Sequence, residues 1–249
     1  MNPIFADLPT TIFEDMSIRA RDRGAINLGQ GFPDAEGPED VRRAAAEATI
    51  NGPNQYPPMR GIPALREAIA DHYAHHQDLA IDRDREVIVT SGATEALAAS
   101  ILGLVRPGDE AIIVQPAYDA YAPLVRQAGG KPKFIRTGPP EWTITREALE
   151  GVITDKTAFI ILNSPHNPTA TMLSEAELSL LADICKTHDL IAICDEVWEH
   201  LTFDDRHHKS LMVIDGMHER TVKIGSAGKI FSLTGWKVGW VIAPSPLAN

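Results

Sequence analysis

Three single residues and one short turn have the side-chain types and the surroundings for chemistry, and the most unusual is Lys229. It lies between Gly228 and Ile230 in a stretch of small and apolar residues, where an ammonium ion is uncommon. A partly desolvated lysine loses its proton more readily, and its amine can then form a Schiff base with an aldehyde or ketone. The Gly-Lys dipeptide alone favours an ordinary solvated lysine. The case for Lys229 therefore depends on residues upstream.

Two of those upstream residues follow apolar runs. Asp195 ends the run 191–194, and Asn167 comes after another apolar run, between Pro165 and Pro168. An interior carboxylate needs a partner to stay charged; a protonated heterocyclic nitrogen would serve, and a salt bridge to a lysine or arginine is the common alternative. The prolines hold the backbone stiffly enough to aim the Asn167 amide, although a plain proline-rich turn has the same sequence.

The fourth position is the turn 91–94, Ser-Gly-Ala-Thr, which separates a β-branched run at 86–90 from a helical pattern at 95–105. Such a turn presents free backbone amides at the positive end of a helix, which suits a phosphate. A simply capped helix is the alternative. The four positions together offer an amine, a carboxylate, an amide and a phosphate cradle. They describe a site for pyridoxal phosphate.

Strands and helices must alternate to hold these positions. The pattern predicts strands at 86–90, 110–114, 131–137, 157–163, 190–194 and 221–225, and helices at 38–50, 62–75, 95–105, 118–128 and 174–188. Ser174 and Glu177 form a capping box that opens the last of these helices. Continuous apolar strands separated by helices favour an α/β fold, a three-layer sandwich around a mostly parallel sheet. The carboxyl ends of its strands would gather the four positions.

Composition narrows the class of protein. The 249 residues include 44% hydrophobic residues and carry a formal net charge of -11, which argues against a nucleic-acid surface. No signal segment or membrane-length apolar run is present, so a cytoplasmic location is expected, with no membrane partner. Two cysteines, Cys185 and Cys194, predict buried free thiols. The pairs His75-His76 and His207-His208 are interpreted as solvated surface, and no metal is predicted.

The chain resembles the fold-type I, class I and II aminotransferases, which depend on pyridoxal phosphate, and most closely the kynurenine, glutamine and methionine aminotransferase branch. The resemblance covers essentially the whole chain. Its most specific segments are Asn163-Ser164-Pro165-His166-Asn167-Pro168-Thr169, Asp195-Glu196-Val197, Ser226-Ala227-Gly228-Lys229 and Thr234-Gly235-Trp236-Lys237-Val238-Gly239. The segment 27–34 with Asn54-Gln55-Tyr56 carries the likeness to that branch.

The resemblance implies a role for each matched residue. Lys229 would carry the cofactor aldehyde as a Schiff base, Asp195 would pair with the pyridine nitrogen, and Asn167 would contact the ring oxygen and the substrate. Gly31 would approach the substrate carboxylate, and Tyr56 would reach the cofactor of a neighbouring subunit, so a homodimer is implied. Further cofactor contacts would come from Gly92, Ala93, Thr94, Tyr118, Trp198, Ser226 and Lys237.

Three residues depart from the family pattern. Trp198 replaces a common tyrosine and has no hydroxyl to tune the Schiff base. Ala170 replaces a usual glycine, which matters if that residue needs a positive φ. Lys237 stands where many members have arginine, so a point charge replaces a bidentate phosphate grip.

The resemblance also predicts a domain organisation. Residues 1–35 would be an N-terminal arm contributing to the small domain, and residues 36–249 a cofactor-binding large domain that is incomplete at its C-terminus. The small domain would be largely missing, together with the arginine that binds the substrate's α-carboxylate. We expect a transaminase that moves the amino group of an L-amino acid to a 2-oxo acid. The alternatives are a carbon-sulfur β-lyase that uses the same cofactor and an inactive, truncated aminotransferase-like module.

Overall fold

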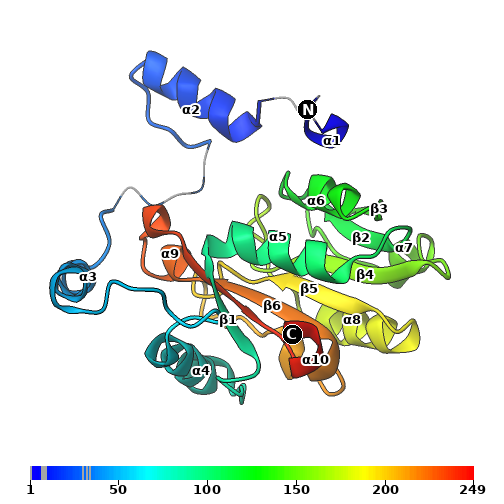
Figure 1. The fold of residues 1–249 in the computed structure, drawn as a ribbon. Coiled ribbons are helices and arrows are strands. Elements are labelled where there is room, and N and C mark those ends of the chain that lie inside the picture. The colour runs from blue at the N-terminus through cyan, green and yellow to red at the C-terminus, as the bar shows by residue number, and fades with distance from the viewer. Residues whose placement is uncertain (1, 7–9, 30, 32, 34) are drawn as a thin grey trace.

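The computed structural model describes residues 2–6, 10–29, 31, 33 and 35–249. Within them one sheet has the strand order β1-β7-β6-β5-β4-β2-β3 (Figure 1). The strands are β1 (Val87–Ser91), β2 (Glu110–Gln115), β3 (Lys131–Arg136), β4 (Thr157–Asn163), β5 (Ile191–Asp195), β6 (Thr221–Ser226) and β7 (Val238–Ile242). The mostly parallel sheet is confirmed: β2 to β6 pair in parallel, and only β7 runs antiparallel to its neighbours β1 and β6.

Six of the strands lie within one residue of the positions that their apolar runs predict. The seventh, β7, is not among the predicted strands. Its residues follow the glycine-rich segment 234–237, whose pattern is typical of a turn rather than of a strand interior. The sequence therefore predicts the centre of the sheet and misses the strand that joins β1 to it.

The helices connect the strands and cover the sheet. They are α1 (Pro3–Ala6), α2 (Ile12–Asp22), α3 (Glu39–Asn51), α4 (Pro63–Gln77), α5 (Gly92–Leu104), α6 (Tyr121–Gln127), α7 (Arg146–Glu150), α8 (Glu175–Thr187), α9 (Ala227–Ile230) and α10 (Ser245–Ala248). The capping box of α8 is confirmed, because Ser174 accepts from the Glu177 amide and Glu177 from that of Ser174.

Three of the predicted helices begin within one residue of the expected start, and two begin three residues away from it. Helix α5 begins at Gly92 instead of residue 95, because Gly92 has a φ of +79° and turns the chain from β1 directly into the helix. Helix α6 begins at Tyr121 instead of residue 118. This start places Pro123 in the first turn of α6. Backbone N–H groups in the first turn have no intrahelical acceptor, so proline costs the helix no hydrogen bond there.

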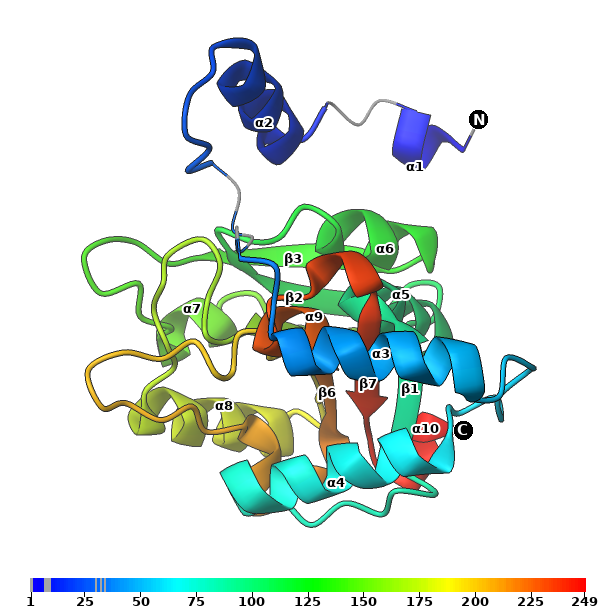
Figure 2. The same ribbon diagram turned by 90° about the vertical axis from the view of Figure 1, so that its left-hand side faces the viewer.

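Helices α5 and α6 lie over one face of the sheet, and α4 and α8 over the other (Figures 1 and 2). Successive side chains along each strand point to opposite faces of the sheet, so each face has its own apolar core. Ile193 and Ile224 pack with α5, whereas Cys194 packs with α8. Both cysteines are free and buried, as predicted. This three-layer arrangement places the carboxyl ends of β4, β5 and β6 together beside the N-terminus of α5.

The N-terminal helices α1, α2 and α3 contain no buried residue. Figure 2 shows α2 apart from the layered body, whereas α1 lies near α6, where Asn2 donates to the Gln127 side chain at 2.6 Å. Large apolar side chains such as Ile12 and Met16 are therefore exposed, by 65% and 40%. Gln30, Phe32 and Asp34 of the expected 27–34 motif lie outside the described residues, and the division at residue 35 stays a prediction. No helix in the described part of the chain is long and apolar enough to cross a bilayer.

Candidate active site

A cavity of about 450 Å³ opens at the carboxyl ends of β5 and β6, beside the N-terminus of α5. A volume of this size suits a cofactor or small metabolite. The predicted positions that line it are Gly31, Gly92, Ala93, Thr94, Tyr118, Asn167, Asp195, Trp198, Ser226, Lys229 and Lys237. Residues separated by up to two hundred positions in the sequence thus meet in one place, as the topology predicts.

Lys229 lies on the short helix α9, directly after β6. Its Nζ donates to the backbone oxygen of Gly31 at 3.3 Å and lies 4.4 Å from the centroid of the Trp198 ring. Burial lowers the pKa of the Lys229 amine, with Lys237 acting in the same direction and Asp195 against it. The amine is therefore easier to deprotonate than that of a solvated lysine, which is the property that nucleophilic chemistry needs.

Asp195 ends β5 with only 6% of its surface exposed. Its Oδ2 accepts a 2.7 Å hydrogen bond from the Tyr121 hydroxyl, and its Oδ1 accepts from the Val197 amide at 3.4 Å. Burial raises the pKa of Asp195, while these two hydrogen bonds lower it. Its partners are a hydroxyl and an amide rather than the lysine or arginine of the salt-bridge alternative. The carboxylate thus faces a cavity in which a cationic ring nitrogen would be stabilised.

The loop after β4 is held by its own side chains. Asn163 donates from Nδ2 to the Asp195 backbone oxygen at 2.8 Å and accepts from the Asn167 amide at 2.9 Å. His166 bonds Thr169 Oγ1 through Nδ1 and the Pro116 oxygen through Nε2, at 2.7 and 3.0 Å. These contacts fix Asn167 on the cavity wall. The flanking prolines predict a stiff backbone at Asn167, and the contacts of Asn163 and His166 hold that backbone as well.

Ala170 ends this loop with a φ of +56°. An L-residue other than glycine is strained in this left-handed region by about 1 kcal/mol. The replacement of the usual glycine by alanine, which matters only where φ is positive, therefore falls at a strained position. The strain concerns stability rather than chemistry, because Ala170 does not line the cavity.

The predicted phosphate cradle depends on close backbone contact between α5 and β7. A Cβ placed on Gly239 of β7 would lie 2.5 Å from the Gly92 carbonyl carbon and 2.6 Å from the Ala93 nitrogen. Only glycine permits that approach. It brings the first amides of α5 beside Ser226 and Lys237, which also line the cavity. The positive end of the 13-residue helix α5, a hydroxyl and an ammonium group thus line one part of the cavity, a combination that suits an anion.

Tyr56 is the one predicted site residue that does not line the cavity, and its side chain is 99% exposed. A residue that is expected to contact a neighbouring subunit is exposed when a single chain is considered. Of the cavity-lining residues outside the predicted set, Tyr121 and Asn163 both donate hydrogen bonds to Asp195. Asn163 begins the Asn163–Thr169 motif that carries the family resemblance, so the sequence does contain a signal for it. Nothing in the sequence pairs Tyr121 with Asp195.

A buried ionic network lies directly behind Asp195. The fully buried Lys223 forms ion pairs with Glu196 and Glu199, the latter at 2.8 Å. His208 Nε2 contacts Glu196 at 2.7 Å, and its side chain is 3% exposed. The interpretation of His208 as solvated surface is therefore wrong, because the turn after β5 folds it onto Glu196. Although burial acts to raise the pKa of Glu196, Lys223 and His208 outweigh it and hold the pKa at about 2.

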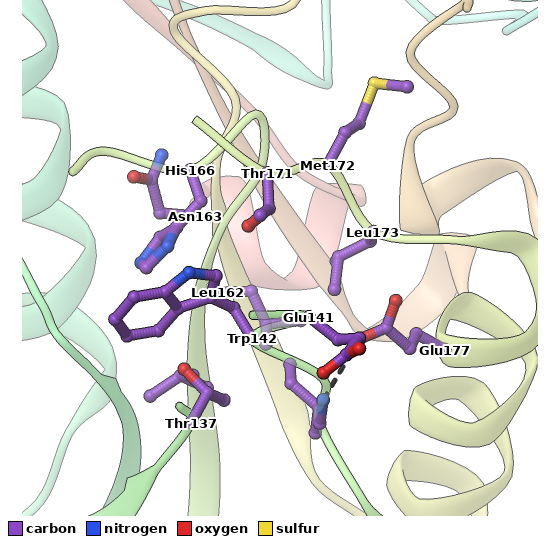
Figure 3. A pocket seen from close by; sticks show the side chains of 12 residues that line it. Thr137, Glu141, Trp142, Leu162, Asn163, His166, Thr171, Met172, Leu173 and Glu177 are labelled. Atoms are coloured by element: carbon purple, nitrogen blue, oxygen red, sulfur yellow. Dashed lines mark hydrogen bonds between the residues drawn. The ribbon is translucent and has the colours of Figure 1, made fainter. Parts of the chain in front are cut away.

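A second cavity lies on the other side of the Asn163–Asn167 loop (Figure 3). Its volume of about 40 Å³ holds no more than a few water molecules. Figure 3 shows the Trp142 indole between His166 and Thr137, and Glu177 accepting from the Ile144 amide at 3.0 Å. This second cavity is too small for a cofactor. Its wall includes His166, which holds the loop on the side away from the active site.

Comparisons with known proteins agree with this geometry. The family model for class I and II aminotransferases matches residues 23–249. A probable N-succinyldiaminopimelate aminotransferase of Mycobacterium tuberculosis is 46% identical over 240 residues, covering 96% of this chain and 60% of the relative. The methionine aminotransferase of Escherichia coli is 42% identical over 241 residues, covering 97% of this chain and 62% of the relative.

A solved structure of N-succinyldiaminopimelate aminotransferase from Mycobacterium tuberculosis superposes with a TM-score of 0.96 at 44% identity. The match covers 99% of this chain and 65% of that one. The chain thus spans less than two thirds of the relatives and of the structure it matches. The expected likeness to a branch that includes methionine aminotransferases is confirmed.

Proposed function

Because the chain belongs to the class I and II aminotransferases, a family of pyridoxal-phosphate-dependent enzymes, we propose that it forms the cofactor site of a transaminase that moves the amino group of an L-amino acid to a 2-oxo acid. The observation that supports this most strongly is the placement of Lys229 and Asp195. An amine of lowered pKa and a buried carboxylate without a basic side-chain partner line the same cavity as an anion cradle.

The described residues fit the cofactor on chemical grounds. Its phosphate requires amide donors and positive charge, which the N-terminus of α5, Ser226 and Lys237 supply. Its aldehyde requires an accessible amine, which Lys229 supplies. Its ring nitrogen requires an anion in a dry environment, and Asp195 is buried and accepts a hydrogen bond from the Tyr121 hydroxyl. Asn167 would donate to the ring oxygen, and Tyr118 and Trp198 would pack against the ring.

The chain's own proton-moving group would be Lys229. The cofactor supplies an electron sink that stabilises negative charge at the substrate α-carbon. Lys229 Nζ would hold the cofactor aldehyde. Once displaced by the substrate amine, it would take the proton from the substrate α-carbon and return a proton to the cofactor carbon. Burial favours the neutral amine that acts as this base. Tyr121 would position Asp195, whose charge is needed throughout.

We further propose that the whole protein is a homodimer, in which Tyr56 reaches the cofactor of the neighbouring subunit and Gly31 lies near the substrate carboxylate. The exposure of Tyr56 and of apolar side chains such as Ile12 and Met16 supports this proposal. Residues 1–35 would belong to the small domain. The β-lyase alternative needs the same cofactor site, but the relatives that the chain matches are named for amino-group transfer.

The test is reconstitution of the purified chain with pyridoxal phosphate, followed by borohydride reduction and mass mapping. We expect a visible absorption band and a cofactor adduct on Lys229, and loss of both in Lys229→Ala. Lys223→Met is unsuitable as a comparison because it breaks the buried network, so Lys156→Ala, an exposed lysine, is the matched control and should keep the adduct.

Activity is assayed in a separate, unreduced portion of the same preparation, as amino-group transfer to a 2-oxo acid and as pyruvate and thiol release from a cysteine conjugate. An adduct on another lysine, or none, would overturn the site assignment. An adduct on Lys229 with thiol release and no amino transfer would overturn transamination in favour of the lyase. The two results are separable because the adduct reports the site and the product reports the reaction.

A further inference from the structure

A cluster of three histidines lies on the face of the sheet opposite the active site. His72 and His76 are one turn apart on α4, and His200 follows the turn after β5. Their ring centroids are separated by 4.6 Å (His72–His76), 4.9 Å (His72–His200) and 5.0 Å (His76–His200). His72 is half-buried, and His76 and His200 are exposed. The cluster is thus accessible from solvent on one side.

Two imidazoles in the cluster face each other through their Nε2 atoms. His72 Nε2 and His200 Nε2 are 2.9 Å apart, and a carboxylate oxygen of Glu199 lies within 4.8 Å of the ligand atoms of both. Imidazole nitrogens and a carboxylate oxygen are the ligand set that zinc and related divalent ions bind in proteins. Spacing at i and i+4 on α4 adds His76 as a neighbouring imidazole.

Glu199 has room for one more partner. Its Oε1 accepts from the Tyr73 hydroxyl at 2.8 Å, and its Oε2 accepts from Gln77 at 2.6 Å and from Lys223 at 2.8 Å. An ionised carboxylate offers about four lone-pair sites. Three of these are used, so one remains at Oε1. The Tyr73, Gln77 and Lys223 contacts hold the carboxylate in place, as outer partners hold the ligands of metal sites.

We propose that His72, His200 and Glu199 bind a divalent transition-metal ion of the zinc type, with solvent or His76 completing the coordination. Tetrahedral coordination with bonds of about 2.0 to 2.1 Å places two ligand nitrogens about 3.3 Å apart. The observed 2.9 Å separation needs only a small side-chain rotation to reach it. This site is independent of the aminotransferase reaction, because α4 and the cofactor cavity lie on opposite faces of the sheet.

Metal binding requires no net gain or loss of a proton by the two imidazoles. In the metal-free protein one of the two Nε2 atoms must carry the hydrogen that joins them. When the ion binds, both Nε2 atoms give a lone pair, and that hydrogen moves to Nδ1 of the same ring as the tautomer changes. The bound ion would tie α4 to the segment after Asp195.

The experiment is a calorimetric titration of the reconstituted chain with Zn²⁺, in buffer freed of unbound cofactor, which would itself chelate metal. Co²⁺ in place of Zn²⁺ reports the geometry through the visible bands of a tetrahedral complex. The variants are His72→Ala and His200→Ala, and the matched control is His207→Ala, an exposed histidine outside the cluster. Circular dichroism confirms that each variant is folded; His200 is exposed, so its removal leaves the core intact.

We expect saturable binding of one Zn²⁺ per chain, a rise in melting temperature with added Zn²⁺, and tetrahedral Co²⁺ bands. Each of the two cluster variants should weaken binding by about 10- to 100-fold, while His207→Ala leaves the affinity unchanged. Absence of saturable binding to the unmodified chain would overturn the proposal. Unchanged affinity in both His72→Ala and His200→Ala would overturn it as well, since binding would then lie elsewhere.

Discussion

The hydroxyl of Tyr121 donates a 2.7 Å hydrogen bond to the carboxylate of Asp195, and both groups are buried. Tyr121 comes from the first turn of α6 and Asp195 from the end of β5, so the packing of one helix on the sheet positions the anion of the site. A hydrogen bond to the charged form of an acid favours that form. Tyr121 therefore helps to keep Asp195 ionised although burial raises its pKa.

Tyr121→Phe should move the acidic limb of the pH–rate profile of the whole enzyme to higher pH. The variant loses a hydrogen bond that lowers the pKa of Asp195, so the carboxylate becomes protonated at a higher pH. A hydrogen bond to a charged group contributes about 1.5 to 3 kcal/mol, which corresponds to a shift of about one to two pH units. Tyr118→Phe removes a neighbouring hydroxyl and should leave the limb in place. An unmoved limb in Tyr121→Phe would contradict this role.

Lys223→Met should destabilise the fold by about 3 to 5 kcal/mol, because it leaves Glu196 and Glu199 buried without their cation. Methionine nearly keeps the volume, so a cavity does not explain the loss. The measurement is urea unfolding at neutral pH. Lys156→Met, at an exposed position, is the control and should change the free energy of unfolding by less than about 0.5 kcal/mol. A loss below about 1 kcal/mol for Lys223→Met would show that the network matters little for stability.

Ala170→Gly should stabilise the protein by up to about 0.6 kcal/mol. Glycine relieves the left-handed strain at a φ of +56°, which outweighs the extra entropy it gives the unfolded chain. The same substitution at Ala99, an exposed residue inside α5, should destabilise by about 1 kcal/mol. Opposite signs in thermal or urea unfolding are the expected result, and a destabilised Ala170→Gly is the contradicting one.

Gly239→Ala should weaken pyridoxal phosphate binding by about tenfold or more, because the new methyl group would force β7 away from the first amides of α5. Cofactor affinity is measured by fluorescence titration. Gly103→Ala provides the control: it lies in α5 and its Cβ would meet nothing within 4 Å, so its affinity should match that of the unmodified chain. Equal affinities in both variants would place the phosphate elsewhere.

Much of the site can be predicted from the sequence because single polar residues interrupt apolar runs. Lys229 and Asp195 stand out in that way, and parallel strands bring their carboxyl ends to one edge. The six predicted strands are also continuous apolar runs. In each case the information is local, so a short stretch of sequence is enough.

The rest depends on contacts between residues far apart in the chain. Tyr121 and Asp195 are 74 positions apart, and Tyr73 and Glu199 are 126 apart. No pattern within either segment signals such a pair. His208 shows the same limit, since an ordinary polar loop sequence becomes buried only because Glu196 and Lys223 are behind it. The antiparallel insertion of β7 likewise has no local signal.

The pairing of β1 with β7 has a consequence for how the protein is made. Among the residues that the structure describes, strand β1 has β7 as its only neighbour in the sheet, although all the other strands lie between them in the chain. A ribosome releases residues in order, so β1 and the turn at Gly92 must wait, with their edge unpaired, until residues 238–242 emerge. Before that moment β2 to β6 can pair with one another. The proposed phosphate cradle is therefore the last part of the site that can close during synthesis.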